Sequence, residues 1–202
     1  MPATPQVLAS PGSAESLQSS TIDAAQADMR HGYYSGGTGI LASALAWTAA
    51  AITAFMAMPQ RAIWVLLIGG MLIHPVGLLI CRLLGASGRH ASGNPLAGLA
   101  GASTFWLIFS LPMAYVLGLQ QPAWFFAAML LVIGGRYLVF ATIYGMRLYW
   151  VLGLSLAAAG VASVLLGAGA AWVAASGAAL EAGFALACLG GHRRRMRDSG
   201  RQ

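Results

Sequence analysis

The chain has 202 residues, of which 58% are hydrophobic and only 8% carry a charged side chain. Soluble domains carry roughly 25% charged residues. The composition therefore excludes an ordinary soluble fold, a disordered chain and a disulfide-stapled secreted domain. No Asp or Glu occurs between Met29 and Leu180. These features are typical of a protein that crosses a membrane several times.

The first segment, residues 1–34, lacks the basic start and apolar core of a signal peptide. It is rich in Ser, Ala and Gln, which predicts a mostly disordered cytoplasmic tail. An amphipathic helical piece over residues 21–30 is the alternative, because Ile22, Ala25 and Met29 would share one helical face.

The membrane domain is expected to cover residues 35–190. Six apolar segments within it are each about 20 residues long, which is enough to cross about 30 Å of hydrocarbon. Proline, glycine and polar residues separate them, with expected limits at 38–58, 62–83, 96–118, 123–145, 148–168 and 171–190. The sequence predicts an all-α polytopic membrane helix bundle with six transmembrane helices.

The arginines predict the orientation of these helices. With both termini in the cytoplasm, Arg61 alone lies outside, whereas nine arginines lie inside: Arg30, Arg82, Arg89, Arg147, Arg193, Arg194, Arg195, Arg197 and Arg201. Such asymmetry follows the positive-inside rule. We interpret these residues, including the basic C-terminal tail over 191–202, as topology signals and anchors to anionic lipid. Nucleic acid is not an expected partner.

Glu181 is the clearest ionisable residue inside a predicted span. It lies roughly 14 Å from either surface of the membrane, at 1.5 Å per helical residue. Its carboxyl must be protonated, paired or placed in a wet cavity. It could carry a proton or bind a cation, or it could be a neutral or paired group that fixes helix packing.

Arg136 and His74 lie at comparable depth in the fourth and second spans. Arg136 could pair with Glu181, or its side chain could reach the inner surface. His74 precedes Pro75, which removes a helix hydrogen bond and predicts a kink. His74 could bond the freed carbonyl or relay a proton. If the even-numbered spans meet, Glu181, Arg136, His74 and Tyr137 would form one central polar site.

A stripe of small residues recurs every four positions in the last two spans, and predicts that they pack tightly together: Ala159, Ser163, Gly167, Ala171, Ala175, Ala179, Gly183 and Ala187. No motif for a metal, a nucleotide or another cofactor is present. The seven-residue spacing of His74 and Cys81 is the sole hint of an enzyme.

Three stretches resemble a family of small bacterial multi-span inner-membrane proteins of unknown function: GGMLIHPVGLLICRLL (69–84), NPLAGLA (94–100) and WFFAAMLLVIGGRYLVFATIYGMRLYWVLG (124–153). The resemblance covers residues 30–190. It implies a bacterial inner-membrane location, and it implies no activity.

The leading functional hypothesis is a small transporter-like or ligand-binding protein, whose central polar site takes a small solute or a proton. The alternative is a structural or regulatory membrane subunit that binds a partner protein through a tail. An intramembrane enzyme is the least favoured hypothesis. Besides the lipid bilayer, the sequence predicts no specific partner and no oligomeric state.

Overall fold

The computed structural model describes residues 11–56 and 58–199, with side chains over 21–56 and 58–191. Within these ranges every regular element is helical. A short 3₁₀ turn, η1 (Tyr34–Gly36), precedes the second of seven α-helices: α1 (Pro11–Gly32), α2 (Gly37–Phe55), α3 (Pro59–Leu83), α4 (Leu96–Gln120), α5 (Pro122–Tyr144), α6 (Leu148–Leu165) and α7 (Ala170–Ser199). Prolines at the first helical position begin α3 and α5, where a missing N–H costs nothing.

Six of the described helical segments are long and apolar enough to cross a membrane: Tyr34–Phe55, Pro59–Leu83, Leu96–Gln120, Pro122–Tyr144, Leu148–Leu165 and Ala170–Gly191. The prediction of an all-α chain with six such helices is therefore confirmed. The first segment begins at Tyr34 rather than at residue 38, because η1 continues into α2.

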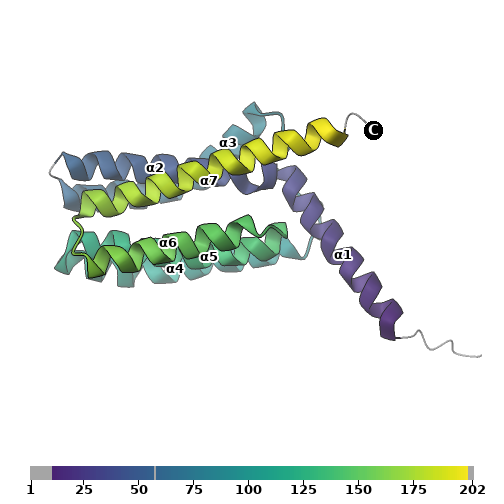
Figure 1. Cartoon of the computed structure of the whole chain (residues 1–202), viewed down its shortest axis with the longest axis horizontal. Coiled ribbons are helices and arrows are strands. Elements are labelled where there is room, and N and C mark those ends of the chain that lie inside the picture. Colours follow the sequence, from purple (N-terminus) through teal and green to yellow (C-terminus); the bar gives the residue numbers. More distant parts are fainter. Residues whose placement is uncertain (1–10, 57, 200–202) are drawn as a thin grey trace, which may run out of the picture.

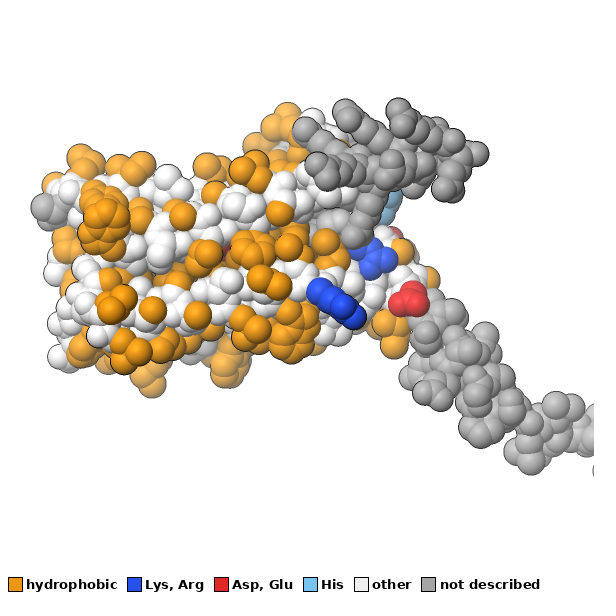
Figure 2. Space-filling model, in the orientation of Figure 1, with side chains coloured by type: hydrophobic (Ala, Val, Ile, Leu, Met, Phe, Trp, Pro, Cys, Tyr) orange, Lys and Arg blue, Asp and Glu red, His pale blue; other side chains and the backbone are white. Residues whose placement is uncertain are grey.

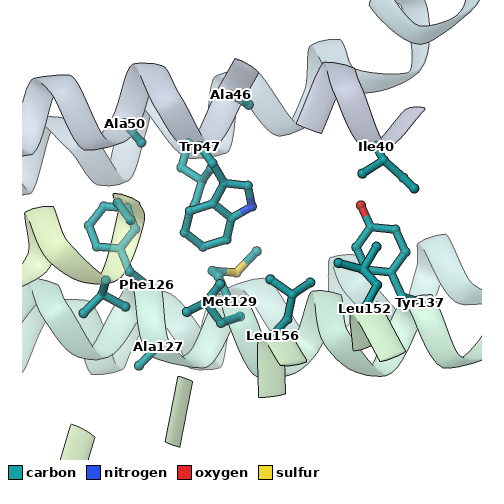
Figure 3. Packing of buried hydrophobic residues seen from close by; sticks show 14 of the residues in the cluster. Ile40, Ala46, Trp47, Ala50, Phe126, Ala127, Met129, Tyr137, Leu152 and Leu156 are labelled. Atoms are coloured by element: carbon teal, nitrogen blue, oxygen red, sulfur yellow. The ribbon is translucent and has the colours of Figure 1, made fainter. Parts of the chain in front are cut away.

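The helices form two layers, with α2, α3 and α7 in one and α4, α5 and α6 in the other (Figure 1). In each layer one helix is central: α2 packs against α3 and α7, and α5 packs against α4 and α6. Fully buried side chains such as Trp47 of α2, Phe126 of α5 and Leu156 of α6 fill the space between the two layers (Figure 3). Exposed apolar side chains cover the long sides of the bundle, and the charged side chains in view gather at the end that carries α1 (Figure 2).

Glycines let α5 and α6 approach each other through their backbones. A Cβ added at Gly134 would lie 2.6 Å from the carbonyl oxygen of Gly153, and one at Gly160 would lie 2.8 Å from that of Ala127. The prediction that α6 and α7 pack tightly is wrong, because these helices lie in different layers. Ala179, Gly183 and Ala187 are exposed, and α7 instead packs along α2.

The N-terminal segment is helical over Pro11–Gly32, which agrees with the helical alternative over residues 21–30 rather than with disorder there. Residues 1–10 lie outside the described part, but α1 is helical and its last turns contact the bundle. Met29 is 4% exposed, Gln26 donates to the Thr142 carbonyl at 2.8 Å, and Arg30 donates to that of Tyr144 at 2.6 Å. The partners lie more than 110 residues away, so no local sequence pattern could reveal them.

Candidate functional site

A cavity of about 680 Å³ lies between α3 and α4, over a floor formed by α2 and α5. At the end opposite α1, α3 and α4 touch each other. The rings of Trp64 and Tyr115 lie 5.6 Å apart, and a Cβ at Gly118 would lie 3.0 Å from Ile63 Cδ1. This contact closes that end of the cavity.

At the α1 end of the cavity, the segment that joins α1 to η1 contacts the loop between α3 and α4. The Gly88 N–H donates to the Gly32 carbonyl at 3.0 Å. The Tyr33 hydroxyl and His90 Nδ1 hydrogen bond at 2.9 Å, and both residues line the cavity. Burial raises the pKa of Tyr33, so its hydroxyl stays protonated and able to make this bond.

A second set of contacts fastens α1 to the same loop. Asp28 Oδ2 accepts hydrogen bonds from the Asn94 amide at 2.8 Å and from the Ala91 N–H at 2.9 Å. These two bonds, led by the one from Asn94, lower the pKa of Asp28 below its ordinary value. We call residues 25–34, which carry these contacts with the loop between α3 and α4, the strap.

The remaining side of the cavity is the long gap between α3 and α4. These two helices have few contacts along their described length beyond the end opposite α1. Cavity-lining residues on both helices are exposed there, namely Met71 and His74 of α3 and Phe105 and Ile108 of α4. With the bundle in a bilayer, this side faces the hydrocarbon.

Arg136 of α5 lies at the middle of the cavity floor and reaches toward α4. Its Nη2 donates to Thr104 Oγ1 at 3.0 Å, and its Nε donates to Ser103 Oγ at 3.5 Å. The guanidinium carbon lies 5.0 Å from the centre of the Phe140 ring, a cation–π distance. Arg136 therefore lies inside the bundle and bonds neutral hydroxyls rather than Glu181.

Glu181 of α7 is fully buried. Tyr137 donates its hydroxyl to Glu181 Oε1 at 3.0 Å, and Ser43 of α2 interacts with both groups. Among the described residues, Glu181 Oε2 and Trp47 Nε1 are the buried polar side-chain atoms without a hydrogen-bond partner. Ser43, Trp47 and Tyr137 border the cavity, so Glu181 lies one side chain behind its wall.

His74 also faces the cavity, but it is exposed and lies in α3, a helix that continues through Pro75. The structure thus brings Arg136, Tyr137 and His74 to one cavity and places Glu181 behind Tyr137. An enzyme that used Cys81 as its nucleophile would need His74 beside the thiol, but the partner of Cys81 is Thr38. Its Sγ lies 3.0 Å from Thr38 Oγ1, rather than beside His74.

The predicted lipid anchors that the structure describes are exposed: Arg82, Arg89 and Arg147 lie at the α1 end of the bundle. The side chains of Arg193, Arg194, Arg195 and Arg197 lie outside the described residues. Over the described ranges, no group of three His, Cys, Asp or Glu side chains could hold a metal ion.

The sequence interpretation missed the connection between the strap and α6. Tyr34, Ser35 and Gly36 have φ angles of 51°, 55° and 77°, a left-handed run that is costly for the two non-glycine residues. Tyr149 donates its hydroxyl to the Ser35 carbonyl at 2.7 Å, which holds the run in place. The sequence signal for this left-handed run was the pair of adjacent glycines, Gly36 and Gly37.

Six apolar helices around a buried polar cluster define the class of the molecule, a multi-pass membrane protein. Residues 22–190 match DUF7010, a family of unknown function, and the chain belongs to this family. No curated protein and no solved structure matches the chain.

Proposed function

We propose that this protein binds a small molecule within the membrane, as a ligand-binding or transporter-like protein. The cavity between α3 and α4 is the observation that carries the proposal. Its volume of about 680 Å³ lies in the ordinary range for small-molecule sites, about 300–1,000 Å³. Its lining is mostly apolar with a few polar groups, the usual composition of such sites.

In this proposal Arg136 contacts the polar part of the ligand, and His74 is a second polar group on the opposite wall. Glu181 accepts a hydrogen bond from the Tyr137 hydroxyl at 3.0 Å and interacts with Ser43, but its buried Oε2 has no hydrogen-bond partner among the described residues. An ionised carboxylate would be costly in that setting. We therefore expect Glu181 to carry a proton and to sense the cavity through Tyr137.

The proposed membrane is the bacterial inner membrane, with the α1 end in the cytoplasm. The resemblance to small bacterial membrane proteins supports the location. Four arginines lie at the α1 end of the bundle, namely Arg30, Arg82, Arg89 and Arg147, whereas Arg61 lies near the start of α3 at the opposite end. This distribution supports the orientation.

The cavity favours ligand binding over the alternative of a structural or regulatory subunit. An internal cavity forfeits packing contacts, and a subunit that acts through a tail has no need of one. Co-purification of a stable partner protein, lost when residues 191–202 are removed, would favour the alternative.

A cavity-filling variant tests the proposal. Gly70 lines the cavity, and a Cβ added there meets no atom of another helix within 4 Å, so we expect the side chain of Gly70→Leu to occupy the cavity. Gly183→Leu is the matched control, because Gly183 is an exposed helical glycine of α7 with equal room. Native mass spectrometry from mild detergent should show a bound small molecule on the wild type and on Gly183→Leu, and none on Gly70→Leu. The same bound mass on both variants would contradict the proposal.

A further inference from the structure

We propose that the ligand is a single-chain amphiphile with an anionic headgroup, which reaches the cavity sideways from the bilayer between α3 and α4. This inference rests on the proposed function and names the chemical class of its ligand.

The charge of the cavity favours an anion. Arg136 is the one arginine among the described lining residues, and the same lining contains no Asp or Glu. Its guanidinium donates to two neutral hydroxyls, those of Ser103 and Thr104, so its charge is not neutralised by a hydrogen-bonded carboxylate among the described residues. A planar guanidinium in a water-poor space is a strong partner for a carboxylate or a phosphate.

The polarity of the cavity changes along its length. The lining residues of α3 run from Leu66 to Cys81, a length of about 22 Å at 1.5 Å per residue. Beyond Arg136, toward the end opposite α1, the lining is apolar and includes Leu66, Leu67, Ile108, Leu111, Met129 and Ile133. Toward α1 it includes Thr38, Cys81, His90 and the tyrosines of the strap and α5. A long space with one apolar half fits a hydrocarbon chain whose head lies at Arg136.

The route into the cavity follows from the contacts at its two ends and from the exposed lining residues between α3 and α4. Trp64 and Tyr115 meet at one end, and Tyr33 and His90 meet at the other. The exposed lining residues Met71 and Phe105 lie on the side between the two helices. A ligand that is already dissolved in the bilayer can enter there without passing the contacts at either end.

Trp47 provides the reporter for a test. It borders the cavity and is fully buried, whereas the other five tryptophans, Trp64, Trp106, Trp124, Trp150 and Trp172, are exposed. Replacing those five with Phe leaves Trp47 as the single emitter. In phosphatidylcholine vesicles at alkaline pH, 9,10-dibromostearate should quench Trp47 at least three-fold more strongly than its neutral methyl ester. Unbrominated stearate should reverse the quenching.

Four variants in the Trp47-only background identify the residues responsible for the quenching. Arg136→Gln should remove the preference for the acid, and Arg136→Lys, which keeps the charge, should retain part of it. Gly70→Leu should abolish quenching by both probes, and Gly183→Leu should leave it unchanged. The acid and the ester are also compared in the Trp47-only protein that retains Arg136. The test therefore does not depend on the folding of an Arg136 variant.

Equal quenching by acid and ester, or a preference that survives Arg136→Gln, would overturn the inference. Reversal by inorganic phosphate as efficiently as by stearate would also overturn it, because the site would then bind free anions. If bound small molecules still distinguish Gly70→Leu from Gly183→Leu in native mass spectrometry, the proposed function survives and the ligand class alone is wrong. If that difference is also absent, the proposed function itself fails.

Discussion

Glycine has opposite roles at different positions beside the central helices α2 and α5, because some glycines bring helices together and others border open space. On the flank of α6 and α7, glycines bring helices into close contact: Gly134 meets the backbone at Gly153, and Gly177 lies against the Trp47 indole. On the flank of α3 and α4, Gly39, Gly70 and Gly101 border the cavity. A Cβ added at any of these three meets no other helix within 4 Å.

The difference teaches that a small residue in a membrane helix is not by itself a packing signal. Small residues permit close approach, but a neighbouring helix must be positioned to use it. Helices α3 and α4 meet at the end opposite α1 and have few contacts elsewhere along their described length. The same residue type then leaves space that a ligand can occupy.

The largest expected effect comes from a substitution at the close contact between α5 and α6. Gly134→Leu would force a side chain against the Gly153 carbonyl oxygen, 2.6 Å from the added Cβ, and should destabilise the bundle by about 3 kcal/mol. Gly135→Leu is the control, since its Cβ meets no other helix within 4 Å. Thermal melting in detergent should separate the two variants clearly. Equal melting temperatures would show that the close approach of α5 and α6 does not support the fold.

A second substitution tests the strap junction. Gly36 has φ 77°, and a Cβ there would clash with the Tyr149 hydroxyl and lie 2.8 Å from the Tyr144 ring. Gly36→Ala should therefore cost about 2 kcal/mol, measured by thermal melting. Gly39→Ala, one helical turn away with open space around it, should melt within error of the wild type. A larger loss of thermal stability from Gly39→Ala than from Gly36→Ala would contradict this account of the strap junction.

The third prediction concerns the carboxyl behind the cavity wall. A double-mutant cycle of Tyr137→Phe and Glu181→Met should give a coupling of about 1 kcal/mol, the usual range for a hydrogen bond between membrane helices. The cycle of Arg136→Gln and Glu181→Met should give a coupling near zero, because Arg136 bonds α4. A strong second coupling would instead indicate the Glu181–Arg136 pair that the sequence left open.

The smallest expected effect is the pH dependence of the strap. The hydrogen bonds from Asn94 and Ala91 lower the pKa of Asp28, so its stabilisation of the strap is complete above the ordinary value of 3.8. It is lost as the pH falls below that value through the lower pKa of the folded state. Hydrogen exchange of residues 25–34, corrected for intrinsic rates, should show this loss in acid. Asp28→Asn should flatten the profile, and an unchanged profile would mean that Asp28 does not hold the strap.

The sequence predicted the features that depend on local composition. Runs of apolar residues specify six membrane-length helices, and Glu181, placed at mid-span by counting, is fully buried in the bundle. The features that depend on long-range contacts could not be predicted. The bond from Asn94 to Asp28, 66 residues away, and the choice of α2 rather than α6 as the partner of α7 leave no periodic trace in the chain.

The most direct test of the central claim is a crystal structure grown from a lipid mesophase that contains 9,10-dibromostearate. The bromine anomalous signal marks the position of the hydrocarbon chain. The account predicts a peak between α3 and α4, on the side of Arg136 that is lined by Leu66 and Leu111. Bromine peaks confined to the outer surface, with α3 and α4 closed on each other, would contradict it.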